Sequence, residues 1–239
     1  MSSDCFRFKQ FSVYHGGCAA KVGTDGVLLG AWALDVPRDN VPCTILDVGT
    51  GSGLIALMLA QRFADAQIDA IDIDPAAVNQ AEENFARSPW SNRLRCKQIA
   101  FQDLVQTGCQ YDVIVSNPPY FVNSLKNPDA QRRVARHTDT LSYEELLSTG
   151  AQLLTENGSL SLILPAESET AILAMAESVG LYPTRLVRVY SKPGKPVKRL
   201  LIELRKRKGS PCEQSQFYIE SESSPRSDEY TALTKEFYL

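Results

Sequence analysis

The segment Asn117-Pro118-Pro119-Tyr120 combines two hydrogen-bond acceptors with an aromatic ring. An exocyclic or amide nitrogen is a weak nucleophile because its lone pair is delocalised. If the Asn117 side-chain oxygen and the Pro118 carbonyl accepted hydrogen bonds from its two N–H groups, the lone pair would be freed for attack. Tyr120 could stack on the planar group. The segment therefore predicts group transfer to a planar amino or amide nitrogen, driven by positioning and electrostatics. Taken alone, it could also be a proline turn that ends a strand.

A glycine-rich loop lies further toward the N-terminus, where Asp47 is followed by Gly49, Gly51 and Gly53. The third glycine comes one residue earlier than in the dinucleotide fingerprint G-x-G-x-x-G, which disfavours a nicotinamide oxidoreductase. S-adenosyl-L-methionine has no phosphate and needs a loop that passes flat beside its amino-acid tail and ribose, as residues without Cβ allow. Asp47 suits the positive end of that molecule. The loop predicts S-adenosyl-L-methionine as the cofactor.

Two more carboxylates follow later strands of the expected fold. Asp72 ends the next strand and could accept hydrogen bonds from both ribose hydroxyls. Asp103 follows the third strand and could accept from the adenine amine. Asp74 is an alternative to Asp72, although an Asp directly before Pro75 is more typical of a helix cap. Three acids at successive strand ends favour a cofactor site over three unrelated caps.

Residues ahead of the first strand form a short expected helix, with Thr24 or Asp25 as its cap. Lys21 and Thr24 could line the cofactor pocket or close it as a lid. The other interpretation is a capped helix that packs Val27 and Trp32 on the core. Both interpretations remain open at this stage.

Apolar runs alternate with helical segments through most of the chain. The expected strands cover residues 44–48, 67–72, 94–99, 111–116 and 159–164, and the expected helices cover 54–63, 75–87, 142–154 and 166–179. Such alternation predicts an α/β fold with helices on both faces of a parallel sheet. Residues 185–190 and 199–204 form two further strand-like runs joined by a hairpin. We therefore predict a Rossmann-like, mostly parallel seven-stranded sheet with an antiparallel C-terminal hairpin.

We expect one domain for the 239 residues, with an N-terminal extension (1–43), a catalytic core (44–204) and a C-terminal tail (205–239). Within the tail, residues 209–228 are polar and are predicted to form a loose surface segment. No run approaches the roughly 18 apolar residues of a membrane span, and the N-terminus does not resemble a signal peptide. A cytoplasmic protein without membrane contact is expected. Six cysteines without a C-x-x-C pair and only two histidines predict no metal.

Together these motifs resemble class I S-adenosylmethionine-dependent methyltransferases, within the amino-methylating group with an (N/D)PP(Y/F) motif. The resemblance covers residues 44–204. A narrower resemblance spans nearly the whole chain, to the bacterial tRNA1(Val) (adenine-37-N6)-methyltransferase family. It rests on Phe6–Phe11, Lys21–Trp32, Ala135-Arg136-His137, Leu141–Leu146 and the closing Glu236–Leu239. The resemblance implies methyl transfer to N6 of an adenine in tRNA, with Asn117 also close to the cofactor.

The main rival is a protein-glutamine N5-methyltransferase, since a glutamine amide is also planar. Those enzymes resemble this fold but carry a separate N-terminal helical domain, for which 43 residues are too few. Methylation of rRNA or DNA, and a non-catalytic RNA-binding module, are further alternatives. Basic residues favour a nucleic acid, because ten of them fall within residues 185–208 despite a net charge of −3.

Six basic side chains are the expected RNA contacts: Arg136, His137, Lys192, Lys195, Lys198 and Arg199. The hairpin could equally be a solvated edge that blocks sheet pairing, and His137 could anchor a loop. The expected partner is tRNA, bound by a monomer or a weak dimer.

Overall fold

The computed structural model describes residues 4–18, 21–34, 44–119, 141–209 and 211–239. Tyr120, Arg136 and His137, which the sequence predicts to contact substrate, lie outside these residues. None of the described helices is long and apolar enough to cross a membrane.

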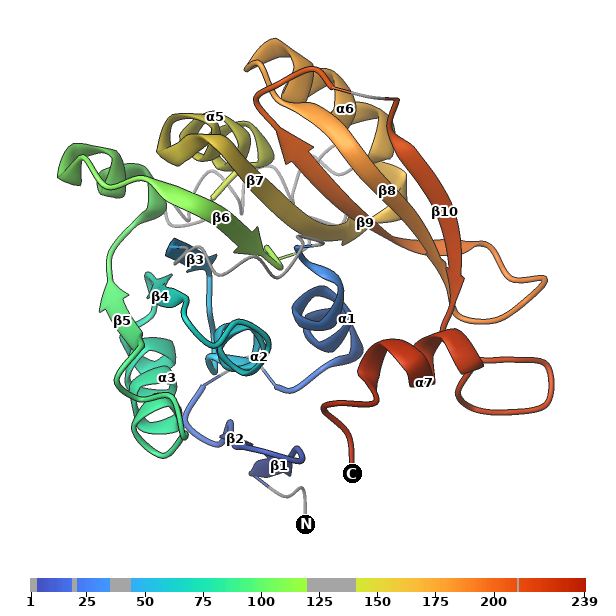
Figure 1. Ribbon diagram of the computed structural model, residues 1–239, viewed down its shortest axis with the longest axis horizontal. Coiled ribbons are helices and arrows are strands. Elements are labelled where there is room, and N and C mark those ends of the chain that lie inside the picture. The colour runs from blue at the N-terminus through green and yellow to red at the C-terminus, as the bar shows by residue number, and fades with distance from the viewer. Residues whose placement is uncertain (1–3, 19–20, 35–43, 120–140, 210) are drawn as a thin grey trace, which may run out of the picture.

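The centre of the molecule is an eight-stranded sheet in the order β10-β8-β9-β7-β6-β3-β4-β5 (Figure 1). Five strands run parallel: β3 (Thr44–Val48), β4 (Gln67–Asp72), β5 (Leu94–Gln98), β6 (Tyr111–Ser116) and β7 (Leu154–Pro165). Strand β9 (Val197–Arg205) is antiparallel to both β7 and β8 (Tyr182–Tyr190). The mostly parallel sheet with an antiparallel C-terminal hairpin is therefore confirmed.

Helices cover both faces of the sheet (Figure 1), because parallel strands such as β3 and β6 are apolar on both sides. One face packs against α1 (Thr24–Trp32), α2 (Leu54–Arg62), α3 (Pro75–Ala86) and α7 (Asp228–Thr234). The other packs against α5 (Tyr143–Leu153), α6 (Glu169–Ser178) and the 3-10 helix η1 (Phe101–Thr107). A second 3-10 turn, η2 (Ala166–Ser168), precedes α6.

The prediction of a loose segment at residues 209–228 is wrong. Residues Glu213–Tyr218 form an eighth strand, β10, which pairs in parallel with β8. The segment lacks the apolar alternation typical of a strand, since four of its six side chains are exposed. An edge strand can form through backbone hydrogen bonds alone, so its side chains carry little signal. Ser227 then caps α7 by accepting a hydrogen bond from Tyr230 N, 3.0 Å away.

The two ends of the chain meet beneath α1 (Figure 1). The N-terminal hairpin consists of β1 (Cys5–Arg7) and β2 (Ser12–Tyr14). Phe8 near its turn stacks on Tyr238 with ring centroids 5.8 Å apart, and Lys9 N donates to Phe237 O over 2.8 Å. Both terminal sequences that resemble the tRNA methyltransferase family therefore belong to one aromatic cluster.

Residues 185–208, which contain the ten basic residues and are called the basic hairpin below, are partly neutralised within the fold. Glu203 of β9 is 2% exposed and forms ion pairs with Arg185 (3.4 Å) and Arg205 (3.0 Å). Thr184 also donates a hydrogen bond to its carboxylate over 3.0 Å. A buried carboxylate with these partners is held by charge and hydrogen bonds together.

Replacing Glu203 by Ala should lower the free energy of unfolding by about 3 kcal/mol, because Arg185, whose side chain is only 15% exposed, would lose its counter-charge. Urea unfolding of the native protein and the variant measures this loss. Glu156→Ala is the control: Glu156 pairs with Arg207, but both side chains are 67% exposed, so its loss should stay below about 0.5 kcal/mol. Equal losses in the two variants would contradict the assignment of Glu203 as a structural anchor.

Candidate functional site

The strand order reverses at β3. The chain proceeds from β3 to β4 and β5 on one side, and then returns to place β6 on the other side of β3. Because these strands are parallel, their carboxyl ends meet at one edge, and a crevice opens where the order reverses. The glycine loop leaves β3 at this point, and Asn117 follows β6 directly beside it.

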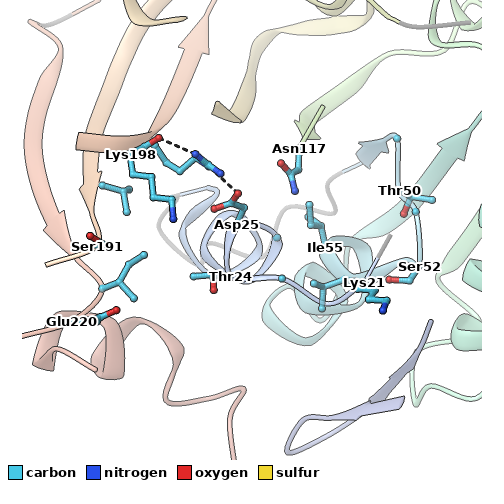
Figure 2. A pocket seen from close by; sticks show the side chains of 18 residues that line it. Lys21, Thr24, Asp25, Thr50, Ser52, Ile55, Asn117, Ser191, Lys198 and Glu220 are labelled. Carbon is cyan, nitrogen blue, oxygen red and sulfur yellow. Dashed lines mark hydrogen bonds and ion pairs between the residues drawn. The ribbon is translucent and has the colours of Figure 1, made fainter. Parts of the chain in front are cut away.

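A cavity of about 490 Å³ opens at this edge (Figure 2), within the usual range for small-molecule sites. Its walls come from the glycine loop, from the segment that leads into α1, and from the ends of β8, β9 and β10. The lining residues that matter for the site are Lys21, Thr24, Asp25, Gly49, Gly51, Asn117, Ser191, Lys198, Arg199 and Glu220.

The glycine loop is held by backbone hydrogen bonds. The amides of Gly49 and Thr50 both donate to the Ile71 carbonyl, over 2.9 and 3.0 Å. Gly49, Gly51 and Gly53 all have positive φ, at 69°, 57° and 80°. The glycines differ in what surrounds them. A Cβ on Gly49 would meet no atom within 4 Å, whereas one on Gly53 would lie 2.6 Å from Phe85 of α3. Gly53 is therefore also required for packing of α3 against the loop.

Asp47 lies beneath the loop and is fully buried. Its Oδ2 accepts hydrogen bonds from the Thr50 hydroxyl (2.7 Å) and the Ala56 amide (3.2 Å), so it links the loop to α2. Its Oδ1 has no hydrogen-bond partner among the described residues. Burial raises the pKa of Asp47 from 3.8 to about 7. Asp47 is not a lining residue of the cavity, so the structure places it as a support for the loop.

Asp72 and Asp103 lie along the same sheet edge, beyond the lining of the cavity. The Asp72 carboxylate accepts from the amides of Gly51 and Asp74, each over 3.0 Å. A carboxylate has about four acceptor positions, so these two bonds orient Asp72 and leave capacity for a ligand. Asp74 caps α3 by accepting from Ala76 N over 2.9 Å, which confirms the cap interpretation of that residue. Asp103 is exposed in the first turn of η1.

Helix α1 and the segment before it contribute both to the cavity and to the core. Lys21 and Thr24 line the cavity, while Val27 and Leu28 are fully buried in the core. Asp25 of the first turn pairs with Arg199 of β9 over 2.9 Å (Figure 2). This ion pair joins two walls of the cavity that are far apart in the sequence.

Asn117 is half-buried and lines the cavity between the glycine loop and β9 (Figure 2). Pro118 is buried, and Pro119 is exposed. The hydroxyl of Ser116 donates to the Val48 carbonyl over 2.8 Å, which ties the end of β6 to the end of β3. Asn117 is therefore held at a set position relative to the glycine loop.

The basic residues predicted to contact substrate separate into two groups. Lys198 and Arg199 line the cavity. Lys192 and Lys195 lie on the exposed connection between β8 and β9, outside the cavity.

The sequence did not single out some residues at this edge. Ile73, which lies between Asp72 and Asp74, is 47% exposed. An apolar residue between two acids at a strand end is the signal that could have singled it out. Ile219 and Glu220 line the cavity because β10 extends along β8, through Ile219 N to Tyr190 O (3.0 Å) and Glu220 N to Ser191 O (2.9 Å).

Asn84 of α3 connects the N-terminal hairpin to the glycine loop. Its side-chain amide donates to the carbonyls of Tyr14 and Ser52, each over 2.8 Å. Its side-chain oxygen accepts from Tyr14 N over 2.9 Å. Asn84 is 1% exposed, so this bridge is shielded from water. It is a positioning residue that the sequence did not reveal.

Comparisons with known proteins agree with this arrangement. The family model described as "Methyltransferase small domain" matches residues 34–184. A protein of Bacteroides fragilis named tRNA1(Val) (adenine(37)-N6)-methyltransferase is 48% identical over all of this chain and 99% of its own. A protein of Flavobacterium psychrophilum with the same name is 46% identical over 98% of this chain and 99% of its own.

Solved structures confirm the fold. A predicted O-methyltransferase from Agrobacterium tumefaciens superposes with a TM-score of 0.68, covers 89% of this chain and 96% of its own, and is 19% identical. The ribosomal protein L11 methylase of Lactobacillus delbrueckii subsp. bulgaricus superposes with a TM-score of 0.56, covers 82% and 84%, and is 18% identical.

Gly53→Ala should lower the free energy of unfolding by about 2–4 kcal/mol, because it combines a left-handed backbone with a clash against Phe85. Gly108→Ala is the matched control. Gly108 has a φ of 69°, but its Cβ would meet no atom within 4 Å, so about 1–2 kcal/mol is expected. Urea denaturation compares the two variants. A smaller loss for Gly53→Ala than for Gly108→Ala would contradict the packing role.

Asp47 should make the protein less stable as the pH rises. Its pKa is higher in the folded state (about 7) than in the unfolded state (3.8), so the folded state binds the proton more tightly. The contribution of Asp47 is therefore fully present below about pH 4 and is lost as the pH rises through about 7. Asp47→Asn should lack this decline. The difference in unfolding free energy between the native protein and the variant, measured from pH 5 to 8, should change with pH; a constant difference would refute the assignment.

Proposed function

This chain belongs to the methyltransferase small domain family and, within it, to the tRNA1(Val) (adenine(37)-N6)-methyltransferases, and we propose that it methylates N6 of an adenine in tRNA with S-adenosyl-L-methionine as the donor. Adenine 37 of tRNA1(Val) is the expected target. The observation that carries the proposal is the position of Asn117, which lies beside the glycine loop at the point where the strand order reverses.

The site fits S-adenosyl-L-methionine in four respects. Gly49 has an open, left-handed backbone position that permits close approach of a ligand. Asp72 is oriented by two backbone amides and retains acceptor positions for two hydroxyl groups. Asp47, whose Oδ1 has no hydrogen-bond partner among the described residues, becomes negatively charged beneath the loop as the pH rises through about 7. The lack of lysine and arginine among Gly49–Gly53 suits a cofactor without phosphate.

The residues of the chain divide the work of transfer. S-adenosyl-L-methionine supplies an electrophilic methyl group on a sulfonium. The glycine loop and Asp72 would hold the cofactor, and Lys21 and Thr24 would close the cavity. Asp103 would accept a hydrogen bond from the adenine amine of the cofactor. The Asn117 oxygen and the Pro118 carbonyl would accept hydrogen bonds from the target amine and free its lone pair. Tyr120 remains the predicted stacking residue. Positioning rather than a strong base would drive the reaction.

Charge supports RNA as the substrate, in a more restricted way than the sequence suggested. Four arginines of the basic hairpin are paired with acids: Arg185 and Arg205 with Glu203, Arg188 with Glu169, and Arg199 with Asp25. In the described part of the chain, Lys192, Lys195 and Lys198 have no acidic partner within ion-pair distance. These three lysines are therefore available to neutralise phosphates. Arg136 and His137 remain predicted contacts.

A tRNA substrate implies that the protein acts in the cytoplasm, and a cavity formed within one chain implies that a monomer or weak dimer suffices. A protein glutamine is the rival substrate, because its amide would fit the same two acceptors.

Asn117→Ala should reduce methyl transfer to a tRNA1(Val) transcript by at least a hundredfold, since the amine would lose an acceptor that acts in the transition state. S-adenosyl-L-methionine binding, measured by calorimetry, should stay within threefold. Asp72→Ala should instead weaken that binding by about a hundredfold, as expected for two lost hydrogen bonds to a charged group. Nucleoside mass spectrometry identifies the product. A methylated protein glutamine, or unchanged transfer by Asn117→Ala, would overturn the proposal; Glu156→Ala controls for surface effects.

A further inference from the structure

The pairing of β8 with β9 shifts by one residue near the start of β9. Val189 of β8 pairs with Arg199 of β9, but the next residue, Tyr190, pairs with Val197. Lys198 is therefore the inserted residue of a β-bulge and faces no partner on β8. Bulges re-aim side chains and are over-represented next to active sites.

The bulge changes where Lys198 points. In a regular strand, neighbouring side chains alternate between the two faces, so Lys198 would face away from Arg199. Instead both residues line the cavity, together with Val189. Figure 2 shows the Lys198 side chain extending into the cavity. The Arg199 guanidinium also donates to the Lys198 carbonyl over 3.0 Å, which holds the bulge in place.

The two basic residues differ in charge balance. The side chains of Arg199 and Asp25 are only 21% and 25% exposed and form an ion pair across the cavity wall. Arg199 is thus largely neutralised, and it acts as a link between α1 and β9. Lys198 is exposed and has no acidic side chain within ion-pair distance among the described residues. Lys198 therefore supplies the positive charge at this end of the cavity.

The sheet sets the separation between Lys198 and Asn117. Strands β9 and β6 are two positions apart in the sheet, which corresponds to about 10 Å. The register pairs Arg199 with Pro165 and Ser116 with Leu162, so Lys198 lies about three residues further along the edge than Asn117. Their Cα atoms are then roughly 14 Å apart. The long lysine side chain spans part of this gap, and a nucleotide whose base lay at Asn117 would extend toward Lys198 through its sugar and phosphate.

The same wall carries two neutral or acidic groups that suit a sugar. The Ser191 hydroxyl can donate or accept, and the Glu220 carboxylate only accepts. A ribose hydroxyl can donate to Glu220, whereas a phosphate cannot. The wall thus presents one cation for a phosphate and acceptors for a sugar.

We propose that Lys198 binds a phosphate directly attached to the target nucleotide, so that this end of the cavity holds the sugar-phosphate while Asn117 holds the base. This inference rests on the proposed function, and it distinguishes Lys198 from Lys192 and Lys195, which would contact more distant phosphates. Lys198 would set the depth to which the target base enters.

A double-mutant cycle tests the contact. Stem-loop RNAs carry a neutral methylphosphonate in place of the phosphate on either the 5′ or the 3′ side of the target adenine. Their binding is measured by fluorescence anisotropy. For the native protein, one of the two neutral linkages should weaken binding about tenfold, as expected for a lost charge-assisted hydrogen bond. For Lys198→Ala, the same linkage should change binding by less than twofold, because its partner is already absent.

The control is Lys97→Ala, which removes a positive charge from the exposed face of β5 at the opposite end of the sheet. It should keep the tenfold effect of the neutral linkage. Lys198→Arg should retain binding to the unmodified RNA within about threefold, which separates loss of charge from misfolding. Equal sensitivity of the native protein and Lys198→Ala to both linkages would overturn the assignment of Lys198. Failure of the native protein to bind or methylate the unmodified RNA would instead overturn the proposed function itself.

Discussion

The parallel hydrogen bonding of β3 to both β4 and β6 is the constraint on which the site depends. Strand β3 lies inside the sheet between β6 and β4 and is buried except for Thr44. The glycine loop follows β3 itself, and the two neighbouring strands bring Asp72 and Asn117 to the same edge. The Ser116 hydroxyl bond to Val48 O then holds the two most important strand ends together. A change in that register would separate the cofactor and target halves of the site.

Buried polar groups around this edge determine the shape of the loops. Three side chains form hydrogen bonds with the glycine loop: Asp47 accepts from the Thr50 hydroxyl, Asp72 accepts from the Gly51 amide, and Asn84 donates to the Ser52 carbonyl. The bonds of Asp47 and of Asn84 to the loop are buried, so an unpaired partner there would be costly, and the Asp72 bond is partly buried. The ion pair between Asp25 and Arg199 closes the opposite wall in the same manner. These bonds therefore preorganise the cavity before a ligand binds.

Ion pairing also changes how the basic hairpin must be understood. A count of basic residues along the sequence treats all ten as equal. In the structure, most of the arginines serve the sheet by pairing with acids of other elements, such as Glu169 for Arg188. Lysines of the β8–β9 connection remain accessible because this loop projects beyond the sheet, and Lys198 enters the cavity because of the bulge. A count of local charges therefore does not indicate which basic residues remain without an acidic partner.

Motifs and spacing in the sequence alone determined the fold class, the positions of the parallel strands along the chain, and the two motifs that follow β3 and β6. These signals are local: glycines at the end of a strand, acids at later strand ends, and Asn117 before two prolines. Tertiary structure alone decided the remainder. Strand β10 is recruited by backbone pairing at an edge, Ile219 and Glu220 reach the cavity through that strand, and the β-bulge at Lys198 follows from pairing with β8. The physical reason is that hydrogen-bond register and ion pairing join residues far apart in the chain, and no local pattern encodes such partners.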